Sequence, residues 1–293
     1  MIKWGGILWS IHPLFVMVML ASALTGYFME LLVLFVIVLV HELGHVAAAK
    51  GFGWRVKEVK LLPFGGVAEV EEAAGVSAKE DVIVALAGPL QNGWMALAAW
   101  GLGQLGLWHS DWASYVVEAN LMIALFNLLP IHPLDGGKLL HALLGSVCQY
   151  YKALLWTARL GLLCSCLMIV ASVVPFWLEE RAVQLNLLVV GLFLFASNRA
   201  YSRNVPFLFL RFLTHRERMT NRAMEAGKKA SHLVVNGSQS LMSVARLFKR
   251  EAFHVVYVSE RDGSSLRMLP ENAIVRSCLS GLGPHRAVSE LLL

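Results

Sequence analysis

Apolar residues fill long, nearly uninterrupted windows along the first 199 residues of the chain, and few charged residues fall within them. A helix needs about 20 consecutive apolar residues to cross the hydrocarbon core of a bilayer. Six windows approach this length, at residues 6–28, 31–49, 80–103, 116–131, 153–175 and 183–198. The pattern predicts a polytopic α-helical membrane protein with six transmembrane helices, the fourth being the shortest.

The overall composition agrees with this prediction. Hydrophobic residues make up 57% of the chain and charged residues 15%, whereas soluble globular domains contain about 25% charged residues. The first window is expected to be retained rather than cleaved as a signal, because Pro13 interrupts it and no small-residue cleavage site follows.

Basic residues in the connections between the windows predict the orientation in the membrane. Every second connection, namely those near residue 29, at 104–115 and at 176–182, is poor in Lys and Arg. Arg181 is the one basic residue in these three connections. Because basic connections stay in the cytoplasm, both termini are expected there. The basic connections carry Lys50, Arg55, Lys57, Lys60, Lys79, Lys138 and Lys152.

Residues 54–72, between the second and third windows, have a different pattern. VKEVKLL and GVAEVEE are rich in β-branched residues that partly alternate with polar ones, and PFGG supplies a turn. The pattern predicts a β-hairpin close to the membrane face. Its edge could accept an unwound substrate segment as an added strand, with Phe64, Gly65 and Gly66 as candidate contacts; alternatively, the hairpin only seals a buried site.

After residue 199 the chain becomes basic, with 14 Lys or Arg against 7 Asp or Glu, compared with 11 against 13 before it. The apolar run at 205–213, followed by RERMTNR, predicts a helix lying on anionic headgroups more readily than a nucleic-acid patch. A solvated linker is the plainer alternative. The expected organisation is a membrane domain at 1–199, a basic amphipathic linker at 200–228 and a small cytoplasmic α/β domain at 229–293.

The small domain shows its own elements. Helical apolar spacing at 240–251 is followed by a strand at 254–260, a turn, a second strand beginning at LRML, and a helix at 270–279 that starts with proline. The expected order is β-α-β-β-α. Its cysteine, Cys278, should stay reduced in the cytoplasm.

The stretch VLVHELGHVAAAK at 38–50 places two histidines and a glutamate inside the second window. An ionisable side chain at the bilayer centre costs about 2.5–3.5 kcal/mol on insertion scales. His41 and His45 are one helical turn apart, so both imidazoles can bind one metal ion. Zinc suits two imidazoles plus an oxygen ligand, with one position left for water, and Glu42 can act as the general base of amide hydrolysis. Buried, hydrogen-bonded histidines are the alternative.

The segment NLLPIHPLDGGKLL at 127–140 supplies a candidate for the oxygen ligand. Pro130 and Pro133 prevent a regular helix there. Non-helical backbone persists at membrane depth only where it is buried in protein or lines a cavity. Asp135 is therefore the expected third ligand. It could also cap the helix that follows, and His132 and His12 are weaker candidates for the metal.

Together, HELGH in the second window, AGPLQN at 87–92 and LDGG about ninety residues after HELGH resemble the site-2 protease family of intramembrane zinc metalloproteases. The resemblance covers the whole membrane portion. It is closest to the branch that lacks a PDZ domain and carries one CBS domain at its cytoplasmic end.

The resemblance implies zinc bound by His41, His45 and Asp135, with Glu42 as the general base. Asn127 and Pro133 match the NPDG-type loop that lies near substrate in this family, and Gly88 and Asn92 match its GxxxN motif. Close helix packing at Gly88 and an amide that caps broken backbone would also explain these last four residues.

The resemblance also implies partners and a location. The substrate would be the membrane-associated precursor of a sporulation sigma factor, cleaved in the mother-cell membrane around the forespore and restrained by membrane-embedded inhibitors. Two CBS-like domains would pair in a homo-oligomer and could bind ATP, although a purely structural dimerisation module is an alternative.

Two other classes of function use the same residues. A zinc or proton transporter would need polar residues along a transmembrane path, and the first, fifth and sixth windows offer very few. A non-catalytic scaffold with a structural zinc would not need Glu42 beside the histidines. The sequence therefore favours an intramembrane metalloendopeptidase.

Overall fold

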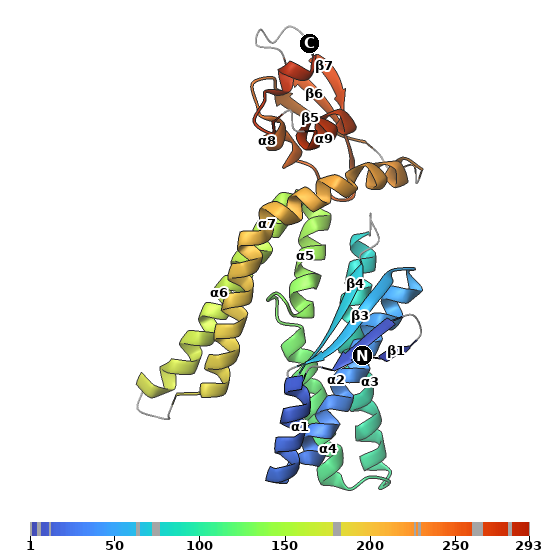
Figure 1. The fold of residues 1–293 in the computed structure, drawn as a ribbon, viewed down its shortest axis with the longest axis vertical. Helices are drawn as coiled ribbons and strands as arrows, with labels where there is room; N and C mark the ends of the chain where they lie inside the picture. Colours follow the sequence, from blue (N-terminus) through green and yellow to red (C-terminus); the bar gives the residue numbers. More distant parts are fainter. Residues whose placement is uncertain are drawn as a thin grey trace. The chain divides into compact units, whose positions relative to one another are not determined.

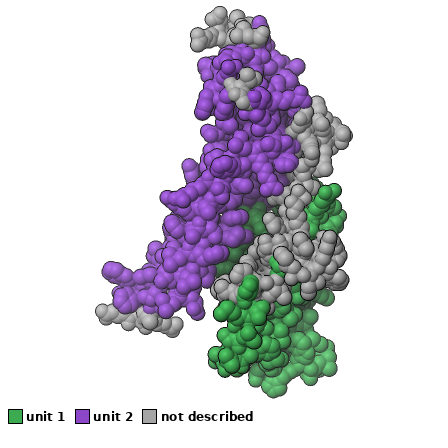
Figure 2. All heavy atoms as spheres, in the orientation of Figure 1, with its two compact units in different colours: residues 1–73, 79–129, 134–139 green, residues 74–78, 130–133, 140–293 purple. Residues whose placement is uncertain are grey.

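A computed structural model gives the structure of the chain, which divides into two compact units (Figure 2). Unit 1 comprises residues 1–73, 79–129 and 134–139, and unit 2 comprises residues 74–78, 130–133 and 140–293. The structure describes residues 2–4, 7–11, 13–62, 65–71, 77–177, 183–225, 227, 230–259, 266–280 and 283–292.

Within these ranges, four helices are long and apolar enough to cross a membrane. They are α2 (Phe28–Gly51), α3 (Ala78–Gln104), α6 (Tyr150–Trp177) and the Leu185–Arg216 part of α7 (Leu185–Glu225). Four of the six expected spans, the second, third, fifth and sixth, are thus confirmed as long apolar helices.

The first and fourth expected spans take other forms. The window at 6–28 splits into strand β2 (Ile7–Ile11) and the short apolar helix α1 (Pro13–Thr25). Proline suits a first helical position, because its fixed φ fits the helix and its missing N–H would have no partner there. The fourth becomes α4 (Ser110–Asn127), in which residues such as Asn120 lower the hydropathy. The expectation of six spans is therefore not confirmed.

The predicted hairpin segment lies in a larger sheet. Strands β3 (Arg55–Leu62) and β4 (Gly65–Glu71) pair antiparallel, β2 pairs parallel with β3, and β1 (Ile2–Trp4) pairs antiparallel with β2 (Figure 1). The order is β1-β2-β3-β4. Because β2 pairs with one side of β3, the edge strands of this sheet are β1 and β4 among the residues that the structure describes.

A non-helical connection joins α4 to α5 (Asp135–Val147). It contains Pro130 and Pro133, where the sequence predicted a break. Gly136 closes it tightly: a Cβ there would lie far inside contact distance of the backbone oxygens of Leu128 and Leu129. The chain can therefore present the first residue of α5, Asp135, directly after a compact turn.

In unit 2, α6 and α7 pack side by side (Figure 1). Gly161 of α6 allows close approach, because a Cβ there would overlap the side chain of Asn198 on α7. Asn198 is fully buried and donates to the backbone oxygens of Leu194 (2.8 Å) and His132 (2.6 Å). These contacts tie residues 130–133 to α7.

The carboxyl-terminal elements follow the predicted order β-α-β-β-α. They are β5 (Ala230–Asn236), α8 (Leu241–Ala245), β6 (Phe253–Ser259), β7 (Leu266–Pro270) and α9 (Glu271–Leu279), with a 3₁₀ turn at Val288–Leu292. Strand β6 is central, parallel to β5 and antiparallel to β7. The helix expected at 240–251 ends at Ala245, because tight turns then carry Phe248 into the core.

A buried ionic cluster joins α7 to this small sheet. The Arg216 guanidinium donates to both carboxylate oxygens of Glu271 and to the backbone oxygens of Arg250 and Ala252. Glu271 also accepts from the backbone N–H of His254 at 2.8 Å and contacts its Nδ1 at 3.0 Å. All three ionisable side chains are at most 1% exposed. Breaking this cluster would leave a buried charge without a partner.

Candidate metal centre

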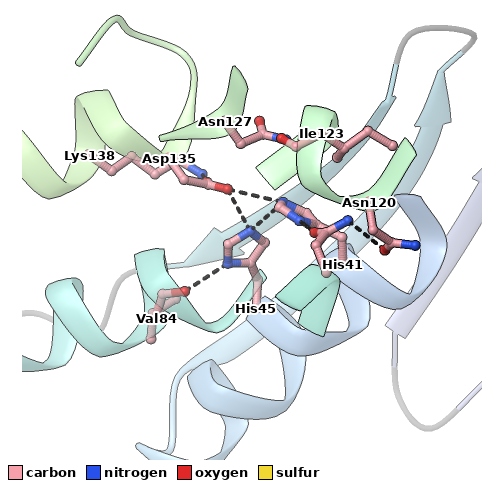
Figure 3. Close-up of polar contacts among 9 residues, drawn as sticks. His41, His45, Val84, Asn120, Ile123, Asn127, Asp135 and Lys138 are labelled. Atoms are coloured by element: carbon pink, nitrogen blue, oxygen red, sulfur yellow. Dashed lines mark hydrogen bonds and ion pairs between the residues drawn. The ribbon is translucent and has the colours of Figure 1, made fainter. Parts of the chain in front are cut away.

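Two histidines on α2 and one aspartate at the start of α5 converge in unit 1 (Figure 3). The Nε2 atoms of His41 and His45 lie 3.1 Å apart. Oδ2 of Asp135 lies 3.1 Å from Nε2 of His41 and 2.9 Å from Nε2 of His45. The three residues are 3%, 6% and 4% exposed. The one-turn spacing in HELGH thus places both imidazoles on the helix face that meets Asp135.

The second nitrogen of each ring is already occupied. Nδ1 of His45 donates to the backbone oxygen of Val84 at 2.7 Å, and Nδ1 of His41 faces Oδ1 of Asn92 at 2.5 Å. Both partners accept, so each neutral imidazole carries its proton on Nδ1. Both Nε2 atoms then present lone pairs. Three acceptor atoms thus point at one another, an arrangement that a cation among them stabilises.

The dimensions and surroundings fit such a cation. Zinc bonds of about 2.0–2.1 Å in a tetrahedral site separate ligand atoms by about 3.4 Å, close to the spacings here. Gly88 on α3 leaves room beside the rings, since a Cβ there would lie 2.6 Å from Nε2 of His41 and closer still to His45. Gly44 on α2 allows the two helices to approach, because a Cβ there would lie 2.7 Å from the backbone oxygen of Ala87.

Asp135 is held at both of its oxygens. Oδ2 faces the histidines, and Oδ1 accepts from Nζ of Lys138 at 2.9 Å, one helical turn along α5. Lys138 itself is half exposed. Outer hydrogen bonds of this kind orient a ligating carboxylate.

Glu42, the expected general base, follows His41 directly and is half-buried. Its carboxylate is not part of the metal-binding group found among the described residues, and its role as general base stays a prediction.

The structure places the expected substrate residues in different surroundings. Gly88 and Asn92 lie against the histidines. Asn127 is half-buried, and its Nδ2 donates to the backbone oxygen of Ile123 at 3.0 Å (Figure 3). Contact of these residues with substrate stays a prediction.

The remaining candidates lie elsewhere or cannot be placed. Pro133 is exposed, while Gly65 and Gly66 begin β4. Phe64 and His12 lie outside the described residues. His132 packs its ring against Tyr201 at 4.5 Å between centroids and is not part of the metal-binding group found among the described residues.

Three groups that hold the site were not predicted from the sequence: the Val84 carbonyl, Asn120 and Lys138. Asn120 had a signal, because it is an amide inside the apolar window 116–131. No sequence feature pointed to the Val84 carbonyl, because every residue has a backbone carbonyl. None pointed to Lys138 either, because a lysine after LDGG is also common at a membrane interface.

Comparison with known proteins identifies related sequences. The chain matches the profile of Peptidase family M50 over residues 29–108 and 104–166. It is 37% identical to stage IV sporulation protein FB of Bacillus subtilis, over 99% of both chains. It is 29% identical to zinc metalloprotease MJ0392 of Methanocaldococcus jannaschii, over 59% of this chain and 49% of that protein.

A solved structure shares the fold. It is the site-2 protease from Methanocaldococcus jannaschii, with a TM-score of 0.53 and 26% identity, covering 69% of this chain and 94% of that one.

Proposed function

The chain belongs to peptidase family M50, the site-2 protease family, and is a metalloendopeptidase, and we propose that it hydrolyses peptide bonds within the membrane at a zinc ion bound by His41, His45 and Asp135. The observation that carries the proposal is the convergence of two imidazole Nε2 atoms and one carboxylate oxygen, all acceptors, in a buried site. Such a set matches the two-histidine, one-carboxylate ligation of hydrolytic zinc sites.

The residues around the cluster suit hydrolysis of an amide. Zinc bound there supplies Lewis-acid activation of a water molecule and of the substrate carbonyl. Glu42 accepts a proton from the attacking water and delivers it to the leaving nitrogen. The water oxygen bonds to the carbonyl carbon as the C–N bond breaks. The helix α2, which carries Glu42 and both histidines, is apolar enough to span a bilayer, which supports cleavage at membrane depth.

We further propose that the substrate is the membrane-associated precursor of a sporulation sigma factor. The support is likeness across 99% of the chain to a protein named stage IV sporulation protein FB. The same likeness supports a place in the mother-cell membrane around the forespore, with both termini cytoplasmic, and control by membrane-embedded inhibitory partners.

An extended substrate segment could pair with the edge strand β4. Strand β4 is an edge of the unit 1 sheet, and β4 and α2 pack against each other. A peptide added there would be held as a strand, with its amide bonds open to attack. The proposed substrate contacts are Gly65 and Gly66 at the start of β4, together with Phe64, Asn127, Pro133, Gly88 and Asn92.

The order of β5, α8, β6, β7 and α9 supports a single CBS-like domain. A repeat of this size buries little core alone, so we propose that two copies pair in a homo-oligomer. ATP is the ligand that such a pair could bind, and a purely structural dimer is the alternative.

Replacing Glu42 by glutamine tests the hydrolytic role. Glu42→Gln should retain zinc, because no ligand changes, and should lower cleavage of a membrane-associated substrate by about 10²–10⁴-fold, the usual contribution of a general base. Zinc content and cleavage are measured on the same purified protein. Undiminished cleavage would refute the role of Glu42. Zinc flux into proteoliposomes without cleavage would instead identify a transporter.

A further inference from the structure

We infer that Asn120 on α4 is a positioning residue for the metal site: acting through Asn92, it fixes which ring nitrogen of His41 faces the metal. The inference deepens the proposed function and rests on it, because it concerns how a proposed zinc ligand is held. Asn120 matches none of the motifs that identify the family.

Asn120 is an amide side chain at a position where burial makes an unbonded polar group unfavourable. It is fully buried, in the middle of a largely apolar helix, and burying an amide is costly unless it is hydrogen-bonded. It makes two bonds: Nδ2 donates to the backbone oxygen of Val116 at 2.8 Å, and Oδ1 accepts from Nδ2 of Asn92 at 3.2 Å. One bond is local, and the other reaches α3.

The Val116 carbonyl fixes the direction of this chain of bonds. A carbonyl can only accept, so Asn120 must turn its NH₂ group toward Val116 and its oxygen toward Asn92. Asn92, also fully buried, must then turn its NH₂ group toward Asn120 and its oxygen toward His41. Nδ1 of His41 must therefore carry the proton, and Nε2 keeps its lone pair for the metal.

The imidazole of His45 also carries its proton on Nδ1, and a single hydrogen bond is enough to fix it there. Its Nδ1 donates directly to the backbone oxygen of Val84. The proton position of each histidine thus traces to a backbone carbonyl, directly for His45 and through two amides for His41. Asn92 alone could not set it, because an amide can present either its oxygen or its NH₂ group to a ring nitrogen.

Removing the Asn120 amide should release this constraint. Asn92 could then rotate and donate to Nδ1 of His41, which would place the proton on Nε2 and block metal binding through that atom. We expect Asn120→Leu, which keeps the size and removes the bonds, to weaken zinc binding about tenfold, the lower end of the effect of outer-sphere partners. The visible spectrum of the cobalt-substituted protein should change with it.

Thr157→Val is the matched control. Thr157 is also buried in an apolar helix, α6, and donates to the backbone oxygen one turn earlier, at Ala153 (2.9 Å). Loss of this local bond should leave zinc affinity and the cobalt spectrum unchanged. A tenfold loss in the control would show that removing any buried hydroxyl or amide disturbs the site, and would overturn the role of Asn120.

A second substitution separates positioning from packing. Aspartate at residue 92 can only accept when ionised, so Asn92→Asp combined with Asn120→Leu should restore zinc affinity to within about threefold of the unmodified protein, as in carboxylate–histidine–zinc sites. A packing defect at residue 120 would not be restored. Tight zinc binding by Asn120→Leu alone, or no restoration in the double variant, overturns the inference.

The ring nitrogens of the unmodified, zinc-free protein provide a test that needs no variant of residue 120. ¹⁵N resonances of labelled histidine should show His41 with its proton on Nδ1, and an Nε2–H tautomer would overturn the inference. An unmodified protein that binds no zinc would instead overturn the proposed function. The two failures are therefore distinguishable.

Discussion

A methyl group on residue 88 would occupy the space next to both ring nitrogens of the metal site. The added Cβ would lie 2.6 Å from Nε2 of His41 and closer to that of His45. We therefore expect Gly88→Ala to abolish zinc binding while the helices remain formed, since alanine favours helix. Zinc content is measured by mass spectrometry and helix content by circular dichroism.

Gly93→Ala is the control for this prediction. Gly93 lies on the same helix, and a Cβ there would meet nothing within 4 Å, so its zinc content should match that of the unmodified protein. Full zinc occupancy in Gly88→Ala would place the ion away from this cluster.

The sequence predicted the set of converging residues but not what holds them. His41 and His45 share a face because helical spacing is local, and Asp135 stands out beside two prolines and two glycines. The contact between Asn92 and Asn120 joins side chains 28 residues apart on different helices. No local pattern specifies which buried amides meet, so this bond appears only in the fold.

At the level of the strand, the edge of the unit 1 sheet makes a prediction. A cysteine at Ala68 in β4 should form disulfides with a cysteine placed near the cleavage site of a substrate, because β4 is an edge. A cysteine at Val59 in the interior strand β3 should not, since both sides of β3 are already paired. Cross-linking yields are compared on gels, and equal yields would contradict pairing of substrate with β4.

The helix α9 contributes its first residue, Glu271, to a buried cluster with Arg216. We expect Glu271→Ala to destabilise the carboxyl-terminal elements by about 3–5 kcal/mol, the usual effect of leaving a buried charge without its partner. Thermal unfolding and limited proteolysis of the full chain in detergent measure this. An unchanged unfolding temperature and proteolysis pattern would contradict the stabilising role of the cluster.

The same cluster predicts how stability depends on pH. Burial alone would raise the pKa of the Glu271 carboxyl, but hydrogen bonds from His254 and Arg216 outweigh burial and hold this pKa below its ordinary value of 4.5. The folded state therefore binds the proton less readily than the unfolded state. The ionised Glu271 carboxyl therefore contributes to the free energy of unfolding above pH 4.5, and this contribution is lost as the pH falls through the lowered pKa. The free energy of unfolding of the unmodified protein should therefore fall in acid. Glu271→Ala lacks this carboxyl, so its free energy of unfolding should not show this fall.

At the scale of the whole molecule, one helix crosses the boundary that composition suggested near residue 199. The helix α7 runs for 41 residues, with Pro206 inside it, and it continues without interruption past residue 199. The chain becomes basic there without any break in the helix. The composition of a segment depends on whether lipid or water surrounds it, whereas the end of a helix depends on capping and packing. The change of composition near residue 199 therefore does not coincide with the end of a helix.

The central claim is that one zinc ion is bound by His41, His45 and Asp135. Zinc K-edge X-ray absorption on the purified protein tests it most directly. The expected result is one zinc per chain with only nitrogen and oxygen neighbours at about 2.0–2.1 Å, two of them imidazoles, and a spectrum that is lost in Asp135→Ala. Sulfur neighbours, or an unaltered spectrum in that variant, would contradict the claim.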